Sequence, residues 1–379
     1  MDQRGLNELR RRFRPERTGI TRIYGCYVNG DREVISWVEA PLALMQQDEQ
    51  EMYLGLLKKA LSGALGRNLI DLSFSTEQVV DSEEHRLLQT LRQSMLQDQA
   101  AREELCRRII EAIDLGETNY LILLAAEAYD VPYRGKDDLD QADASDQVYR
   151  YFVCSICPVK DPKLALQYDT RDKGFHPAST GHIASAPELG FLFPAFDDRA
   201  ANIYDVLFYA KDPGELHEEV IDALFHVAPP LSAPEQKDVF ETALCDALGD
   251  ECSYDVVQSV HEQLHERIGA HKESKDPEPL ALSVREVGGI LANSGVSPER
   301  IETFQDECRE RYGDDAALDP KNLIEDKRFE IATPEVKITV APEDSYLIEA
   351  RLIEGRKYLL VPVDGPVTVN GIEVKLPNH

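Results

Sequence analysis

The chain has 379 residues and a formal net charge of −29, with 41 Lys and Arg against 70 Asp and Glu. At roughly 150 residues a domain, this length predicts two or three domains. A surface this acidic repels nucleic-acid phosphates and anionic lipids, so we expect no DNA binding and no membrane binding. No apolar run in the sequence reaches the roughly 20 residues that a membrane-spanning helix needs.

The first 22 residues are basic, with seven arginines against three acidic residues, or 7 − 3 = +4. Arginine favours two-pronged contacts with carboxylates or phosphates. We predict that this arm lies on the acidic body of its own chain. The alternative is a docking arm for RNA, a ribosome or another acidic partner, through residues 4–22. The candidate binding residues of the arm are Arg10, Arg11, Arg12 and Arg14.

The next hundred residues alternate strand and helix patterns. Residues 20–28 and 33–38 flank an Asn-Gly-Asp turn and predict a hairpin. Apolar spacing predicts a helix over 48–65, a strand over 68–74 and a long helix over 82–113 that residues 97–101 interrupt.

Four short apolar segments then follow, rich in aromatic and branched residues: 120–126, 149–159, 190–196 and 203–210. This pattern predicts buried strands of one sheet. Between the last two lies a predicted hairpin tip with Asp197, Asp198 and Arg199. These side chains either satisfy each other and the turn or form a small polar binding site.

The remaining sequence changes character twice. A proline-rich linker near residues 228–234 precedes helical patterns, and alternation returns from residue 329. We therefore predict an α+β fold: an α/β core over 1–228 with a mixed central sheet and flanking helices, a helical region over 229–325, and a small antiparallel β module over 326–379. The predicted helix after residue 297 carries five acidic residues against three arginines, which is unsuited to a DNA groove.

One helical segment matches the H-E-x-x-H signature of zinc peptidases, at His261, Glu262 and His265. Histidines four residues apart share a helix face and can hold zinc, and the glutamate between them can activate water. His271 falls where an extended signature places a third ligand. However, Ile268 replaces the glycine of that signature, and charged residues follow the motif directly. An amphipathic helix without metal is the favoured interpretation.

A second spacing, Cys154-x2-Cys157 followed by His176 and His182, resembles a structural zinc site. Residues three apart in a strand point to opposite faces, so we predict buried free thiols instead. The chain has seven cysteines, an odd number, and no apolar segment at its start. These features favour a reducing cytoplasm over secretion.

Across most of its length the chain resembles a bacterial family known only as a domain of unknown function. The resemblance rests on residues 61–70 (LSGALGRNLI), 153–159 (VCSICPV), 190–199 (GFLFPAFDDR), 211–217 (KDPGELH), 358–362 (YLLVP) and 369–372 (VNGI). It implies a soluble cytoplasmic protein and brings no activity with it.

The leading hypothesis is therefore a non-enzymatic cytoplasmic interaction or regulatory protein that has a protein partner and needs no cofactor. The first alternative is a zinc-dependent hydrolase that uses Glu262 as its base. The second is an RNA- or ribosome-associated factor that docks through the arginine arm.

Overall fold

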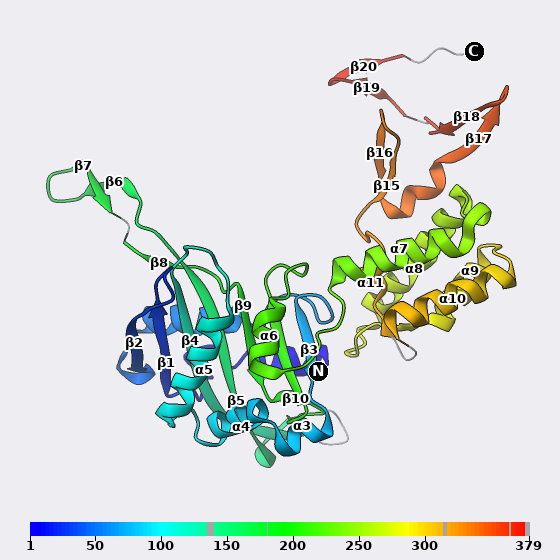
Figure 1. Ribbon diagram of the computed structural model, residues 1–379. Coiled ribbons are helices and arrows are strands. Elements are labelled where there is room, and N and C mark those ends of the chain that lie inside the picture. Colours follow the sequence, from blue (N-terminus) through cyan, green and yellow to red (C-terminus); the bar gives the residue numbers. More distant parts are fainter. Residues whose placement is uncertain (135–139, 180, 314–316, 364, 376–379) are drawn as a thin grey trace. The chain divides into compact units, whose positions relative to one another are not determined.

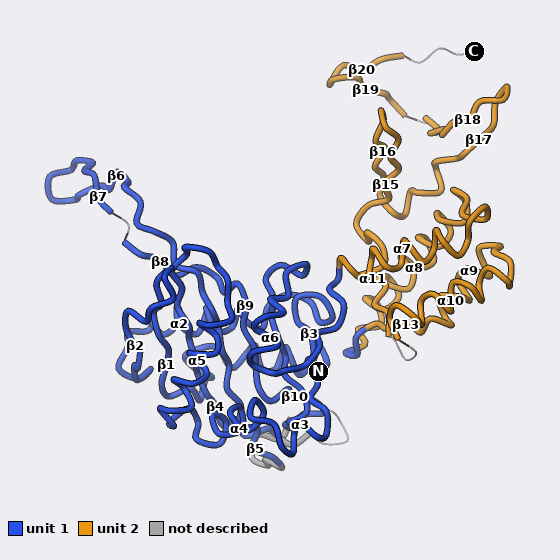
Figure 2. Tube along the Cα trace, viewed as in Figure 1, with its two compact units in different colours: residues 1–233, 277–279 blue, residues 234–276, 280–379 orange. Residues whose placement is uncertain are grey.

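The computed structural model describes residues 1–379 except 135–139, 180, 314–316, 364 and 376–379 (Figure 1). The chain forms two compact units. The first comprises residues 1–233 and 277–279, and the second comprises 234–276 and 280–379 (Figure 2). The predicted division into three regions stays a prediction. None of the helices in the described part of the chain has the length and apolarity that a membrane crossing needs.

The first unit is built on an eight-stranded antiparallel sheet. Its main path runs β2 (Val34–Pro41), β1 (Arg22–Val28), β4 (Tyr120–Arg134), β5 (Asp140–Lys160), β9 (Leu189–Phe193), β12 (Asp205–Ala210) and β3 (Leu69–Ser73), and β8 (Ile183–Ala184) pairs with β5. The four apolar segments form β4, β5, β9 and β12, so their prediction as one sheet is confirmed. The α+β class is also confirmed. Where a mixed sheet is predicted, each described strand pair of this sheet is antiparallel.

Helices cover both faces of this sheet (Figure 1). One face carries α3 (Thr76–Asp81), α4 (Glu83–Gln93), α5 (Gln99–Ala112) and α6 (Glu218–Phe225), and the other carries α1 (Gln3–Arg10), η1 (Leu42–Leu44) and α2 (Gln47–Lys59). Because successive strand residues point to opposite faces, Phe152 and Cys154 enter the first core while Tyr151 and Val153 enter the second. A strand buried on both faces explains the continuous apolar runs in the sequence.

The predicted long helix over 82–113 is two helices. Met95 and Leu96 adopt left-handed conformations with φ of 51° and 61°, which ends α4. The Asp98 carboxylate then accepts a hydrogen bond from the backbone N–H of Ala101 and begins α5. The expected interruption at 97–101 therefore lies beside the actual break. It allows α4 and α5 to pack against the same face of the sheet.

Two hairpins extend the first unit. β10 (Ala195–Asp197) pairs with β11 (Ala200–Asn202), and β6 (Leu164–Asp169) pairs with β7 (Gly174–Ser179). The β6–β7 hairpin leaves the sheet after β5 and returns to it at β8 (Figure 1).

The second unit is a helical cluster followed by short hairpins. Its helices are α7 (Ala233–Leu248), η2 (Gly249–Glu251), α8 (Tyr254–Ser274), α9 (Val284–Asn293), α10 (Pro298–Tyr312), α11 (Pro320–Leu323) and η3 (Pro342–Leu347). Its strands pair two by two: β13 (Leu282–Ser283) with β14 (Ala317–Leu318), β15 (Phe329–Ala332) with β16 (Lys337–Val340), β17 (Glu349–Ile353) with β18 (Arg356–Leu360), and β19 (Val367–Val369) with β20 (Ile372–Val374). Ser283 and Glu286 form a capping box at the start of α9.

Candidate functional site

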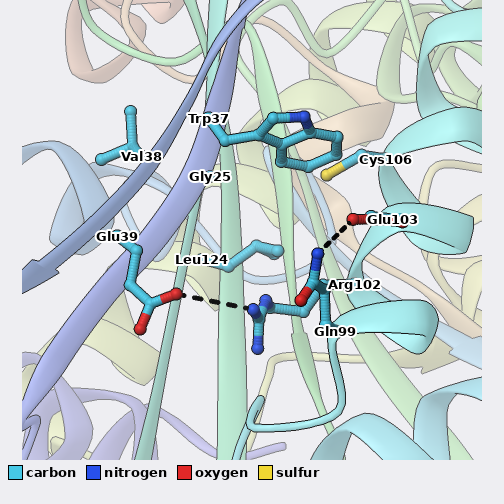
Figure 3. Close-up of a pocket in the computed structure, with 9 residues that line it drawn as sticks. All are labelled: Gly25, Trp37, Val38, Glu39, Gln99, Arg102, Glu103, Cys106 and Leu124. Atoms are coloured by element: carbon cyan, nitrogen blue, oxygen red, sulfur yellow. Dashed lines mark hydrogen bonds and ion pairs between the residues drawn. The ribbon is translucent and has the colours of Figure 1, made fainter.

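A groove runs between the edge strand β2 and helix α5. It consists of two hollows of about 110 and 390 Å³, and Trp37, Glu103 and Cys106 line both. Figure 3 shows the smaller hollow. Trp37 is the only tryptophan of the sequence, and 52% of it is exposed. We call this feature the Trp37 groove. Its other lining residues are Gly25, Arg32, Val34, Val38, Glu39, Gln99, Arg102, Arg107, Ile110, Glu111 and Leu124.

Strand β2 is the outermost strand of the sheet, and within the described chain it pairs only with β1. Its far side therefore presents backbone N–H and C=O groups for which the sheet supplies no partner. Ile35, at the β-bulge of the β1–β2 pair, is 56% exposed. An edge of eight residues with exposed apolar side chains is a ready template for another strand.

Gly25 fixes the inner wall of the groove. A Cβ atom on this residue would lie 1.9 Å from the carbonyl oxygen of Ile122 in β4, so only glycine permits this close approach of β1 to β4. Gly25 is paired with Val38 of β2. The same close approach therefore sets the position of β2 and of the groove.

Arg102 holds α5 against the two outer strands (Figure 3). Its guanidinium lies 4.2 Å from the centre of the Tyr24 ring, and its Nη2 lies 3.8 Å from Oε2 of Glu39. Nη1 also donates a hydrogen bond to the Leu96 carbonyl. With 13% of its side chain exposed, Arg102 is committed to these internal contacts. It is a wall of the groove rather than a free cation.

The carboxylate of Glu103, by contrast, has no cationic partner among the described residues. Its Oε1 accepts a hydrogen bond from Nε2 of the Gln99 amide at 2.7 Å (Figure 3). Glu103 is exposed and borders both hollows. Of the three carboxylates among the described lining residues, Glu39 and Glu111 contact arginines. The groove therefore combines an apolar centre at Trp37 with one carboxylate, Glu103, that can receive a cation from outside.

Cys106 is the cysteine that lines the groove, and its thiol is unreactive. A hydrogen bond to Cys26 and burial raise the pKa of the Cys106 thiol well above its ordinary value. The thiol is thus protonated near neutral pH and is a poor nucleophile. The described lining residues include no histidine, serine or lysine.

The arginine arm folds onto its own chain. Helix α1 buries Leu6 and Leu9 in the second core. Arg10 donates from Nε to the Leu61 carbonyl at 2.7 Å and from Nη2 to the Gly63 carbonyl at 2.9 Å. Burial lowers the pKa of Arg10. The side chains of Arg11 and Arg14 are exposed, and a docking role for them stays a prediction.

Arg12 belongs to a closed charge network around Glu127, which is fully buried. Oε1 of Glu127 accepts hydrogen bonds from Arg12 Nη2, from Arg12 Nε at 3.0 Å and from the backbone N–H of Gly19 at 2.6 Å, and Oε2 accepts one from the Tyr151 hydroxyl at 2.5 Å. Burial alone would lower the pKa of Arg12, but the hydrogen bond and charge of Glu127 raise it. Burial and the same carboxylate raise the pKa of Tyr151 well above its ordinary value.

The predicted tip residues lie at the β10–β11 hairpin. Arg199 donates to Oε2 of Glu8 at 2.5 Å and to the Pro132 carbonyl at 2.7 Å. Asp197 accepts a hydrogen bond from the Asn202 amide at 2.7 Å, and Asp198 is exposed. Arg199 and Asp197 are thus engaged within the chain. A binding role for the tip stays a prediction.

The two histidines of the H-E-x-x-H motif stack on one face of α8, with ring centroids 6.5 Å apart. Nε2 of His261 donates to the Glu325 carbonyl at 3.1 Å, which leaves its Nδ1 as the unprotonated nitrogen. Nδ1 of His261 and Nδ1 of His265 are both buried without a hydrogen-bond partner. Burial lowers the pKa of His261 below its usual 6.5, so the neutral ring is favoured.

These residues fit zinc poorly. The carboxylate of Glu262 accepts a hydrogen bond from the Ser345 hydroxyl at 2.8 Å, and half-buried His271 lies in the last turn of α8. In the described chain no three His, Cys, Asp or Glu side chains are arranged to hold a metal ion. A tetrahedral site needs at least three protein ligands. We therefore derive no zinc chemistry from this helix, and the hydrolase hypothesis rests on the sequence motif.

The Cys-x2-Cys spacing does not form a cluster either. Cys154 lies in the first core and Cys157 in the second, as the strand period requires. His176 lies on the β6–β7 hairpin beside Asp172. Burial raises the pKa of Cys154 well above its ordinary value and that of Cys157 to about 12.

Fold and groove together define a class: an α+β protein with an eight-stranded antiparallel sheet whose outer strand borders an open groove. Residues 1–372 match the model of the family described as Domain of unknown function (DUF4317), and the chain belongs to that family. The resemblance drawn from the sequence is thereby confirmed. No curated protein sequence matches the chain.

Proposed function

We propose that this chain is a non-enzymatic interaction protein that captures an extended segment of a protein partner in the Trp37 groove. The observation that carries the proposal is the open edge of β2 beside a half-exposed tryptophan. An extended peptide that adds to a sheet edge gains main-chain hydrogen bonds, and pockets beside the edge select alternate side chains. Tryptophan is enriched among residues that dominate interface energies.

The groove also indicates the chemistry of the segment. An apolar side chain of the partner would pack on Trp37, and a Lys or Arg would pair with Glu103, which lacks a cation of its own. The net charge of −29 favours a basic partner, because it raises the encounter rate with cationic segments. The proposed ligand is thus an extended segment in which apolar residues alternate with polar ones, at least one of them basic.

We place this activity in the cytoplasm. All seven cysteines are free, and Cys245, on α7, is exposed. Free exposed thiols are typical of a reducing compartment.

Selection of random linear peptides by display against the full chain tests the proposal. We expect apolar–basic alternating sequences whose affinity falls at least about tenfold for Trp37→Ala. Leu44→Ala is the matched control, because Leu44 lies just after β2 and is 84% exposed outside the groove. Glu103→Lys should weaken the same peptides, and a Lys→Glu change in the peptide should restore them. If the selected peptides bound the Trp37→Ala variant as tightly as the unmodified chain, the groove would not be the binding site.

A further inference from the structure

The β6–β7 hairpin has one apolar face. Leu166 is paired with Pro177 and Tyr168 with Phe175 in its register. Because paired residues share a face and successive residues alternate, these four side chains lie on one side of the ribbon together with Leu164. All are exposed: 84% of Leu164, 70% of Leu166 and 65% of Phe175 are accessible. The opposite side carries small and polar residues.

Such a ribbon is poorly stabilised by itself. The described contacts of its apolar face include the rings of Tyr168 and Phe175, whose centroids are 5.3 Å apart. An isolated two-stranded hairpin is marginal in water, and a continuous exposed apolar face marks an interaction surface. The hairpin therefore gains stability when another surface covers that face.

A complementary surface lies at the base of the same hairpin. A hollow of about 620 Å³ is bordered by Met52, Leu56, Leu121 and Ile183, and Met52 is 65% exposed. We call it the base hollow. Ile183 belongs to β8, which follows the hairpin within a few residues and pairs with the end of β5. Both ends of the hairpin thus leave from the rim of the hollow, and its strands of six residues carry the tip about 20 Å away.

Charges on the two surfaces also match. Glu49, Glu51 and Lys59 of α2 border the base hollow, a formal charge of −2 + 1 = −1. Neither carboxylate has a cationic partner in the described chain. The turn between β6 and β7 carries Arg171, Asp172 and Lys173, a formal charge of +2 − 1 = +1. Both cations are exposed, and no described acidic side chain pairs with either. Opposite charges placed in this way favour contact between a hairpin and a base hollow.

We propose that the chain forms a symmetric dimer in which the hairpin of each copy covers the base hollow of the other. Hairpin and hollow are adjacent on one chain, so a two-fold axis lets both contacts form at once. The apolar face packs on Met52 and Leu56, while Arg171 and Lys173 lie near Glu49 and Glu51. This interface is separate from the Trp37 groove, and it stands or falls independently of the proposed function.

Light scattering coupled to size-exclusion chromatography of the full chain measures the mass. At about 50 µM we expect a dimer, and Leu166→Asp with Phe175→Asp should raise the dissociation constant about a hundredfold. The control, Ala165→Asp with Gln167→Asp, adds the same charge on the other side of the ribbon and should stay dimeric. An unchanged far-ultraviolet circular dichroism spectrum verifies the fold of each variant, whereas the unfolding temperature should fall with loss of the dimer. A monomeric parent protein, or equal loss in the control, would overturn the proposal.

A charge exchange tests the pairing itself. Arg171→Glu with Lys173→Glu makes the tip acidic, and Glu49→Lys with Glu51→Lys makes the hollow basic. Each variant alone should be mainly monomeric, because the hairpin turn of one copy then carries the same sign of charge as the hollow of the other copy. Mixed together, the two variants should form a heterodimer in which both contacts are again complementary. Variants that each remain dimeric, or that fail to pair when mixed, would overturn the assignment of the hollow.

Discussion

The arginine arm and the Trp37 groove differ in how far their polar groups are satisfied within the chain. In the arm, Arg12 meets a buried carboxylate that also accepts from Gly19 and Tyr151. In the groove, the described residues give Glu103 an amide partner and no cation, and they leave the outer edge of β2 unpaired. The arginines Arg10 and Arg12, which stand out in the sequence, thus bind groups within the fold. Strand β2, which stands out only by its tryptophan, supplies the open surface.

The contrast has an energetic basis. A buried carboxylate is stable only when donors satisfy its oxygens. Glu127 of β4 therefore depends on Arg12 and Gly19 of the arm, and these contacts hold the arm against β4. An exposed strand edge and an exposed tryptophan cost little in the free chain, because water covers them. The first region contributes to stability, and the second keeps polar groups and an aromatic side chain in contact with solvent.

The largest effect should come from the closed region. Arg12→Gln leaves the fully buried Glu127 without its cation, and we expect the free energy of unfolding to fall by about 3 kcal/mol. Arg11→Gln is the control and should change it by less than about 0.5 kcal/mol, since Arg11 is exposed. Urea denaturation measures both. Equal losses would mean that the arm is not anchored through Arg12.

Arg102 combines features of both regions, because it lines the Trp37 groove but makes contacts within the fold. Arg102→Gln removes the stacking on Tyr24 and the contact with Glu39, and should cost about 1–2 kcal/mol. Peptide affinity should fall as well, because α5 is no longer held against β2. A variant of unchanged stability would show that Arg102 does not fix the groove wall.

The open region should be nearly neutral for folding. Trp37→Ala removes a side chain that is 52% exposed, and we expect the free energy of unfolding to change by less than about 0.5 kcal/mol. The same denaturation experiment reports it. A loss as large as that of Arg12→Gln would mean that Trp37 stabilises the fold, and would contradict the proposed binding role.

The second unit should respond to pH through His261. Its pKa is lowered by burial, so the unfolded chain takes up the proton first as the pH falls. The contribution of the neutral His261 ring to the free energy of unfolding is fully present above pH 6.5, the pKa of histidine in the unfolded chain. It is lost as the pH drops through the lower pKa of the folded chain. His265, Glu262 and Asp326 act on the same ring. His261→Gln should remove this slope between about pH 7 and 5, and exposed His226→Gln should keep it.

The metal hypothesis can be settled by metal analysis of protein purified without added zinc. Because two imidazoles alone are a weak site, we expect less than about a tenth of an equivalent of zinc per chain. A stoichiometric amount that His265→Ala abolishes would revive the hydrolase alternative.

Much of the fold follows from local pattern, and the site does not. The runs at 120–126 and 149–159 predict buried strands because aromatic and branched residues dominate them, and both lie in the sheet. The strand at 33–38 is equally recognisable. Nothing in its pattern indicates that it is the outermost strand, or that α5 lies beside Trp37. Those facts depend on long-range pairing, which single-sequence periodicity does not encode. The single tryptophan of the sequence is the one local signal of the groove.

The central claim is that the Trp37 groove receives an extended basic segment, and Trp37 itself can report it. As the only tryptophan, it accounts for the tryptophan fluorescence of the chain. Titration with a selected apolar–basic peptide should shift this emission to shorter wavelength and saturate, because the half-exposed ring becomes buried. A peptide with methylated backbone amides should fail to do so, since it cannot pair with β2. Peptide binding that leaves the emission unchanged would contradict the account.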